Sequence, residues 1–317
     1  MRVRLMAAVL LLGCTATPSR PAGTPVPATS PTPVPAAKIL PPAERPVDMS
    51  RWPLDPPIRY GGRMYPTLQK AVEAVKPGGT LEIPQGIYDQ TLKLSAKKGL
   101  TLRGLGDGAF LSVSTKVPAV VRVQGSSGIT FEHLFFRRAE VVKEGDPLIL
   151  VTDSNGVSFF RCFLDGAVMR PPDGDGLLVQ GGASILFSSS FLRWAATAMV
   201  LEHVDGSSGI DRSVIAENTR GVQVKSPGGR FTFNVHKSRI VNGEKNLSVG
   251  NAKATTITES IVLLTKGAGD STPATLAEGN EGVITAAAAT KLPDPKGVDW
   301  SWEPPYGLLD ADVASLH

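Results

Sequence analysis

The chain has 317 residues, a formal net charge of +4, and charged residues at 20% of its positions. Charges of both signs are scattered along it, and no block of lysine and arginine alternates with aromatic residues, so no nucleic acid is expected as a partner. A mild positive balance suits an anionic partner and an ordinary soluble surface equally well. Composition therefore excludes one class of partner and selects no other.

The first residues are typical of an export signal, because Arg2 and Arg4 precede an apolar run over residues 5–12. That run is too short to cross a hydrocarbon core of about 30 Å as a helix. The phrase Leu-Leu-Gly-Cys ending at Cys14 resembles the lipobox of bacterial lipoproteins, in which the signal is removed before a cysteine that then carries lipid. The resemblance implies a signal peptide over residues 1–13 and an extracytoplasmic protein anchored to the membrane through lipidated Cys14. An ordinary secretion signal with a chance cysteine is the alternative.

Thr15 follows the cysteine, where the inner-membrane retention signal of enteric bacteria has aspartate, so the outer membrane of a Gram-negative bacterium is expected. Residues 14–50 are rich in Pro, Thr, Ala and Ser and cannot bury enough apolar surface to offset chain entropy. They predict a disordered, extended linker in front of a folded domain over residues 51–317. Once Cys14 carries lipid, Cys162 has no cysteine partner and is expected to be a small core residue of a ladder.

The first regular element is a helix, predicted between Thr67, which can cap its start, and the Pro-Gly pair at residues 77–78, which can end it. Apolar residues recur at helical spacing between these limits. They are Leu68, Ala71, Val72 and Val75. Residues 80–84 and 86–88 then indicate two strands joined by a turn.

Three phrases follow one another in this region. They are Leu-Gln-x-Ala-Val at 68–72, Pro-Gly-Gly-Thr-Leu-x-Ile-Pro-x-Gly-x-Tyr at 77–88, and Leu-Thr-Leu-Arg-Gly at 100–104. Together they resemble the opening of the pectin-lyase-like right-handed parallel β-helix superfamily. The resemblance implies an all-β, single-stranded right-handed parallel β-helix, a solenoid whose N-terminal end is covered by a short capping α-helix.

A repeat predicts the same architecture independently. Ile-Thr-Phe at 129–131 returns as Val-Ser-Phe at 157–159 and as Ile-Leu-Phe at 185–187, two steps of 28 residues. A fixed period of this length indicates stacked units, whereas a β-sandwich would not repeat one phrase at equal steps. Strand neighbours alternate faces, so two inward columns are expected. Their members are Val121, Val123, Ile149, Val151, Leu177, Val179, Met199, Leu201, Val222, Val224, Leu247 and Val249.

In this superfamily, polysaccharide sites lie along the outward face of one parallel sheet. The outward residues of the best-defined sheet are therefore candidates for substrate binding: Arg122, Gln124, Gln180 and Gln223. A lyase in this fold needs a basic side chain to remove a proton beside a uronate carboxylate, and a cation, often calcium, to stabilise the enolate. The catalytic candidates are Lys225 as the base, Glu202 as its carboxylate partner, and His203. The candidates to hold a cation are Asp153, Asp173 and Asp175.

Blander interpretations of the same residues stay open. Glu202 and Lys225 can form a solvated ion pair between coils, His203 can be a turn residue, and Asp-Gly pairs such as those from Asp173 to Gly176 are turn chemistry. The signature motifs of polygalacturonases, pectin methylesterases and alginate epimerases are missing from the sequence. The fold alone does not decide function.

A binding module is the second hypothesis, because Leu150, Leu178 and Val200 form an outward apolar column that suits a partner or a sugar face. The favoured function is a lipid-anchored β-helix that interacts with polysaccharide or another cell-envelope component. The alternative is a calcium-assisted uronan lyase of the pectate-lyase type. The residues from about 290 onward are expected to form a tail that packs back on the solenoid, and residues 299–311 faintly resemble the ending of secreted pectate lyases.

Overall fold

The computed structural model describes residues 52–138, 143–166, 174–226, 230–243, 246–250, 254–258, 260–264 and 283–285. The chain divides into two compact units, 1–39 and 40–317, and every described residue belongs to the second. The predicted signal peptide, Cys14, the linker, Asp173 and the C-terminal tail lie outside the described residues.

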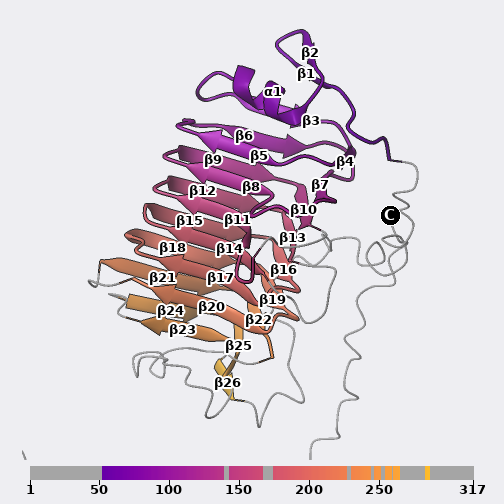
Figure 1. The fold of residues 1–317 in the computed structure, drawn as a ribbon. Helices are drawn as coiled ribbons and strands as arrows, with labels where there is room; N and C mark the ends of the chain where they lie inside the picture. The colour runs from indigo at the N-terminus through magenta and orange to yellow at the C-terminus, as the bar shows by residue number, and fades with distance from the viewer. Residues whose placement is uncertain are drawn as a thin grey trace, which may run out of the picture. The chain divides into compact units, whose positions relative to one another are not determined.

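The described unit is a stack of coils, and its strands form three parallel sheets, named here in the order in which a coil visits them (Figure 1). Sheet 1 contains β5 (Leu92–Ser95), β8 (Val121–Gln124), β11 (Pro147–Thr152), β14 (Asp175–Gln180), β17 (Thr197–Glu202), β20 (Arg220–Lys225) and β23 (Leu247–Gly250). Sheet 2 contains β3 (Thr80–Ile83), β6 (Thr101–Gly104), β9 (Ser127–Glu132), β12 (Asn155–Phe160), β15 (Ala183–Ser188), β18 (Gly206–Asp211), β21 (Phe231–His236) and β24 (Ala254–Thr258). Sheet 3 contains β4 (Gly86–Tyr88), β7 (Ala109–Val113), β10 (Leu134–Arg138), β13 (Phe163–Asp165), β16 (Phe191–Arg193), β19 (Val214–Ala216), β22 (Arg239–Val241), β25 (Ile261–Leu264) and β26 (Val283–Thr285).

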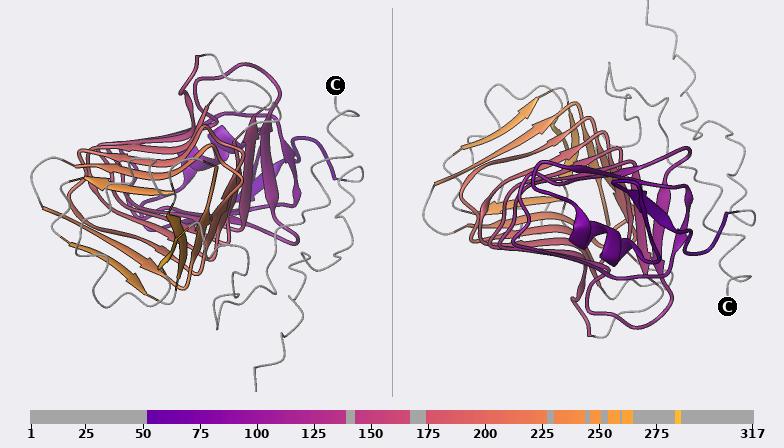
Figure 2. Two further views of the ribbon diagram at one scale, coloured as in Figure 1. Left: turned by 90° about the horizontal axis from the view of Figure 1, so that it is seen from below. Right: turned by 90° about the horizontal axis from the view of Figure 1, so that it is seen from above.

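Successive coils lie in the predicted register. Phe159 pairs with Phe131 on one side and with Phe187 on the other, so residues 28 positions apart are direct neighbours. The rings of Phe131 and Phe159 stack with centroids 5.1 Å apart. The two predicted inward columns are confirmed, because all twelve of their side chains are at most 2% exposed. Seen along the stack, the coils superpose around this shared interior (Figure 2).

A hydrogen-bonded ladder holds the corner between sheets 2 and 3. Four successive coils turn there through two residues, of which the first has positive φ: Arg161, Ser189, Arg212 and Lys237, at 45–51°. The second is buried, and its backbone N–H donates to the side chain one coil further on: Cys162 to Ser190 Oγ at 2.9 Å, and Ser190 to Ser213 Oγ at 3.1 Å. The ladder continues through Ser238 to Ser260. The expectation that Cys162 is a small core residue is confirmed.

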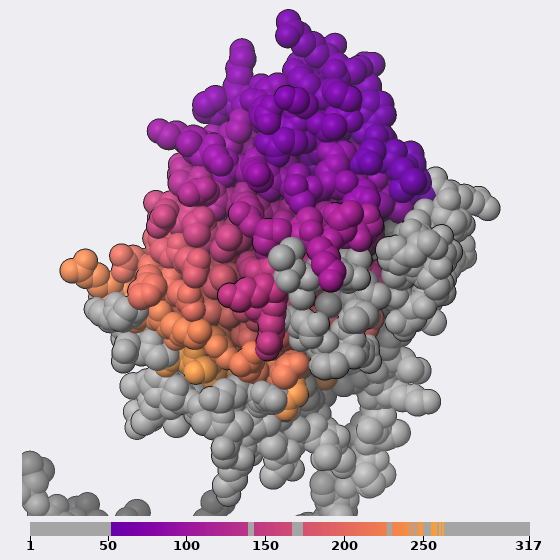
Figure 3. All heavy atoms as spheres, viewed as in Figure 1, coloured from indigo at the N-terminus to yellow at the C-terminus, as the bar shows by residue number. Residues whose placement is uncertain are grey.

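The N-terminal end of the stack is covered by α1 (Leu68–Ala74), as predicted (Figure 2, right). The Thr67 hydroxyl accepts a hydrogen bond from the Lys70 N–H at 3.2 Å, which caps the helix. The apolar side of α1 packs into the interior cluster, and the antiparallel pair β1 (Ile58–Tyr60) and β2 (Arg63–Tyr65) lies beside it. In the space-filling view, the coils follow one another as bands from indigo to orange (Figure 3).

Candidate functional site

Four of the residues predicted to carry chemistry, Gln124, Gln180, Glu202 and Lys225, lie in one row on the outer face of sheet 1. Gln124, Thr152, Gln180, Glu202 and Lys225 are register neighbours in successive strands, as the alternation predicts. Their side chains lie next to one another because each coil adds one strand about 4.8 Å from the previous one. The structure thus brings together three of the predicted residues, Gln180, Glu202 and Lys225.

A short hydrogen-bonded chain joins these three. Gln180 Nε2 donates to Glu202 Oε2 at 3.0 Å, and the Lys225 ammonium lies 3.1 Å from Glu202 Oε1. The hydrogen bond from Gln180, assisted by the charge of Lys225, holds the pKa of Glu202 below its usual range. The Lys225 side chain is 58% exposed. The arrangement has the geometry of an exposed ion pair between coils, one of the two interpretations open from the sequence.

The other predicted catalytic and metal-binding residues are spread around the coil. His203 and Asp153 both occupy turn positions with positive φ, and their N–H groups donate to Lys225 O and Gln180 O at 3.0 Å. Asp175 begins its strand, whereas Asp153 follows the end of the neighbouring one, so the two lie at opposite edges of sheet 1. Within the described ranges, no group of three or more His, Cys, Asp or Glu side chains is placed to hold a metal ion.

Asp175 is tied to its neighbouring coil. Its Oδ1 accepts a hydrogen bond from the Thr197 N–H at 3.0 Å. Burial raises the pKa of the Asp175 carboxyl, and the bonds from Thr197 oppose that rise. The carboxylate therefore has a structural partner in the next strand of the sheet, β17.

The second outward row of sheet 1 contains the remaining predicted residues. Arg122 and Gln223 lie at its two ends and are separated by Leu150, Leu178 and Val200. Leu150 and Leu178 are half-buried, and Val200 is only 4% exposed. The apolar column exists as predicted, but it does not form an open apolar patch, and it keeps Arg122 apart from Gln223.

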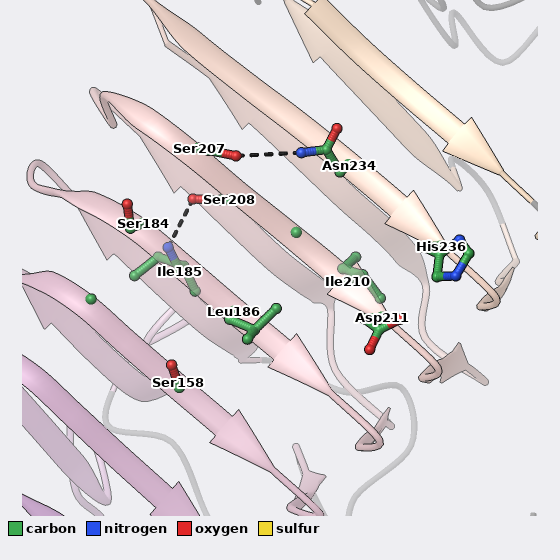
Figure 4. Close-up of a pocket in the computed structure, with 12 residues that line it drawn as sticks. Ser158, Ser184, Ile185, Leu186, Ser207, Ser208, Ile210, Asp211, Asn234 and His236 are labelled. Carbon is green, nitrogen blue, oxygen red and sulfur yellow. Dashed lines mark hydrogen bonds between the residues drawn. The ribbon is translucent and has the colours of Figure 1, made fainter. Parts of the chain in front are cut away.

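A surface hollow lies instead on the outer face of sheet 2, and sequence reasoning missed it. It has a volume of about 300 Å³ and spans strands β12, β15, β18 and β21 (Figure 4). Side chains from several coils surround it, most of them small and polar. They include Ser158, Leu186, Ser207, Asp211, Asn234 and His236.

Gly209 creates the hollow. It sits between Leu186 and Asn234 in one outward row, so one position of the row has no side chain. A Cβ atom there would lie 3.1 Å from Asn234 O, and Gly209 does not have positive φ. The missing side chain, and not a backbone distortion, therefore opens the surface at this point.

The walls of the hollow differ in chemistry. Leu186 is 44% exposed and supplies an apolar wall, whereas Asn234 Nδ2 donates to Ser207 Oγ at 3.3 Å (Figure 4). Asp211 and His236 are register neighbours along the adjacent row. The hollow therefore offers an apolar surface together with amide, hydroxyl, carboxylate and imidazole groups.

The two ionisable side chains are held in place by their neighbours. Asp211 Oδ2 accepts hydrogen bonds from Ser188 Oγ at 3.2 Å and from Arg212 Nε at 2.9 Å. The His236 ring binds Thr258 Oγ1 through Nδ1 at 2.8 Å. Both side chains are half-buried. In this arrangement, Asp211 and His236 still offer polar atoms that a ligand can bind.

The sequence contains a signal for part of this site. The repeated phrase that identified the coils also gives its outward residues, Thr130, Ser158 and Leu186, at the middle position of each copy. The next two coils are shorter by several residues, so the positions of Gly209 and Asn234 in the same row could not be assigned from the spacing of 28.

The comparisons with known proteins identify a fold and no closer relative. No family model and no curated protein matches the sequence. Among solved structures, the chain is similar to the pectate lyase Pel9A, with 14% identity and a TM-score of 0.49 over 69% of this chain and 62% of that one. It is also similar to a pectin methylesterase from Yersinia enterocolitica, with 14% identity and a TM-score of 0.40 over 61% of this chain and 69% of that one.

A pectin methylesterase in complex with a hexasaccharide is a further match, with 13% identity and a TM-score of 0.42 over 77% of this chain and 95% of that one. Likenesses of this size carry no argument about chemistry. Within the part of the chain that the structure describes, no helix is long and apolar enough to cross a membrane. The described unit is a parallel β-helix of three sheets, the architecture that the sequence resemblance implied.

Proposed function

We propose that this β-helix binds a polysaccharide along the outer face of sheet 2, with one sugar unit in the hollow over Gly209. The hollow is the observation that carries the proposal, because it combines an apolar wall at Leu186 with polar groups at Asn234, Asp211 and His236. A sugar ring presents C–H faces and hydroxyl groups, which need both kinds of surface.

The row on either side of the hollow suits an extended ligand. Thr130 and Ser158 precede Leu186 in this row, and Thr256 follows Asn234. Polar side chains therefore flank the hollow on both sides of Leu186 and Gly209, in strands about 4.8 Å apart. A polymer with a repeating unit can meet equivalent groups in successive coils, whereas a compact small molecule would use the hollow alone.

The geometry favours binding over lysis. The Lys225 ammonium lies 3.1 Å from Glu202 Oε1, so this ion pair would have to break before the amine could act as a base. Asp153 and Asp175 lie at opposite edges of sheet 1 and do not face one cation. A calcium-assisted uronan lyase stays the competing hypothesis, with an assay of its own.

Binding to a panel of neutral and anionic polysaccharides, measured by calorimetry and by retardation in polysaccharide-containing gels, tests the proposal. Asn234→Ala combined with His236→Ala is expected to weaken binding at least tenfold, because both remove polar groups from the hollow. Thr152→Ala, on the outer face of sheet 1, is the matched control and should bind as the unmodified chain does. Equal loss in both variants, or no binding to any polysaccharide, would contradict the proposal.

The lyase hypothesis is tested on the same panel with calcium, by following the absorbance of unsaturated uronate. Under the binding proposal no absorbance develops. Absorbance that disappears in Lys225→Ala, and is unaffected by Asn234→Ala, would overturn the proposal in favour of a lyase on sheet 1.

We also propose the anchoring inferred from the first residues of the sequence. In a Gram-negative host the full chain should appear in the outer-membrane fraction and incorporate labelled palmitate. The Cys14→Ser variant should lose the label and appear in the soluble periplasmic fraction. Palmitate labelling of Cys14→Ser, or unlabelled full chain, would contradict a lipid anchor at this residue.

A further inference from the structure

Phe160 is an aromatic side chain at the margin of the hollow on sheet 2. It is the last residue of β12 and the register neighbour of Ser188 in β15, and it lies two positions after Ser158, which lines the hollow. The other phenylalanines in the strands of sheet 2 point inward and are 0% exposed, whereas Phe160 points outward and is half-buried. Within the described part of sheet 2, it is therefore the one phenyl ring that a ligand on the outer face can reach.

Phe160 and Leu186 form an apolar diagonal on this face. Ser158 pairs with Leu186, and Phe160 pairs with Ser188, so these four residues occupy the corners of one block across β12 and β15. From the spacing between strands and the rise along a strand, the Cα atoms of Phe160 and Leu186 are about 8 Å apart. The other two corners hold small hydroxyl side chains, so a flat ring can contact both apolar side chains at once.

This block is continuous with the hollow. Ser158 and Leu186 line the hollow from adjacent strands (Figure 4). Leu186 is 44% exposed, whereas Ser188 is only 5% exposed and donates to Asp211 Oδ2 at 3.2 Å. The surface is therefore low at Ser188, between the outward side chains of Phe160 and Asp211 in the same row.

Arg161 lies beside the ring. It occupies the turn position after β12, with φ at 51°, and its side chain is exposed. Its guanidinium carbon lies 5.4 Å from the centroid of the Phe160 ring, within the range of a cation–π contact. That contact favours one orientation of the ring, and a guanidinium carries five N–H donors. Hydrogen-bond donors therefore lie at the edge of an apolar ring.

We propose that Phe160, Leu186 and Arg161 form a second sugar subsite beside the hollow, in which one unit of the polysaccharide packs its C–H face against Phe160 and Leu186. Hydroxyl groups at the rim of that unit accept hydrogen bonds from the Arg161 guanidinium. The inference rests on the proposed function, because it needs a polysaccharide bound in the hollow. It adds a requirement on the ligand: the unit at this subsite is a sugar ring with one face free of polar substituents.

The positions of the two subsites set the path of the sugar chain. Phe160 belongs to β12, and Gly209 belongs to β18, two strands further along the stack. Two strand spacings are about 10 Å. A ligand that fills both subsites must therefore cross the strands, along the axis of the stack, and a single sugar can fill only one of the two.

Calorimetry with the polysaccharide that the panel identifies, and with the tetrasaccharide prepared from it, tests the subsite. Phe160→Ala is expected to bind both about tenfold more weakly, the scale of one aromatic contact. Phe160→Tyr keeps the ring, is the matched control, and should bind as the unmodified chain does. If Phe160→Ala binds as tightly as the unmodified chain while Asn234→Ala with His236→Ala loses affinity, the second subsite is wrong and the hollow stands. No binding to any polysaccharide would overturn both.

Fluorescence of a Phe160→Trp variant gives a second readout that does not depend on a loss of binding. A sugar ring packed on the indole displaces water from it, so saturating tetrasaccharide should shift the emission of this variant to shorter wavelength. The unmodified chain, with its four tryptophans, is the control and should show no such shift. Equal spectra with and without ligand in Phe160→Trp, at a concentration at which calorimetry shows the site to be full, would contradict a sugar unit at Phe160.

Discussion

Cys162 shows how far a single position can be understood from its place in the coil. Its thiol is fully buried within the ladder, and burial raises its pKa to about 12. At pH 8 the thiolate fraction is then about a thousandfold below that of an exposed thiol. In the Cys14→Ser chain, alkylation by iodoacetamide should be at least a thousandfold slower in the native state than in urea. Comparable rates in the two states would show that Cys162 is accessible.

Glu202 illustrates a residue whose pKa is lowered by a side chain of the coil before it. The hydrogen bond from Gln180 is the largest cause of its lowered pKa, so Gln180→Leu should move that pKa back toward the ordinary value. A depressed carboxyl pKa contributes stability above the unfolded value and loses it as the pH falls through the folded value. Gln180→Leu should therefore destabilise at pH 7 and have little effect at pH 2, by urea unfolding at each pH. Destabilisation that is equal at both pH values would contradict this linkage.

At the scale of an element, the ladder between sheets 2 and 3 makes a sharper claim. The Ser213 hydroxyl accepts from the Ser190 N–H at 3.1 Å and donates to Asp211 O at 2.7 Å. Ser213→Ala would leave a buried N–H without an acceptor, at a cost of about 1–3 kcal/mol. Ser213→Cys is the matched control, because Cys162 fills the equivalent position in an earlier coil. Urea unfolding should rank Ala well below Cys, and equal stabilities would remove the ladder as a source of stability.

The elements that could be predicted from the sequence are those in which a local pattern decides the outcome. The helix before the stack was predicted from its apolar spacing and from Thr67, which does cap it. The interior columns follow from strand alternation combined with the step of 28, and the structure has both the alternation and that register. The row of Gln180, Glu202 and Lys225 followed from the same alternation.

Two features could not be predicted in this way. The first depends on where coils of unequal length meet, and the second depends on the burial of outward side chains. The hollow exists because Gly209 lies between Leu186 and Asn234 in one row. Gly209 follows Leu186 by 23 residues and precedes Asn234 by 25. In sheet 3, the register neighbours Arg137, Asp165 and Arg193 occupy outward positions that alternation assigns to solvent, and yet all three side chains are buried. Strand alternation does not encode their burial.

For the molecule as a whole, the stack converts distance along the chain into a short distance in space, and every proposed surface relies on this. The hollow takes groups from four strands, and each interior column takes six side chains from six strands. A repeat unit of this kind cannot bury its apolar face without its neighbours. Binding and stability should therefore depend jointly on the vertical order of the coils.

Pyrene excimer fluorescence tests that order most directly. Pyrene on cysteines at positions 152 and 180, in the Cys14→Ser chain, should give strong excimer emission, because Thr152 and Gln180 are register neighbours. Labels at positions 152 and 225 serve as the control, since Lys225 lies two strands beyond Gln180 in the same row. The stacked β-helix predicts strong emission from the first pair and weak emission from the second. Weak emission from the first pair, or stronger emission from the second, would contradict the stack and with it the proposed binding face.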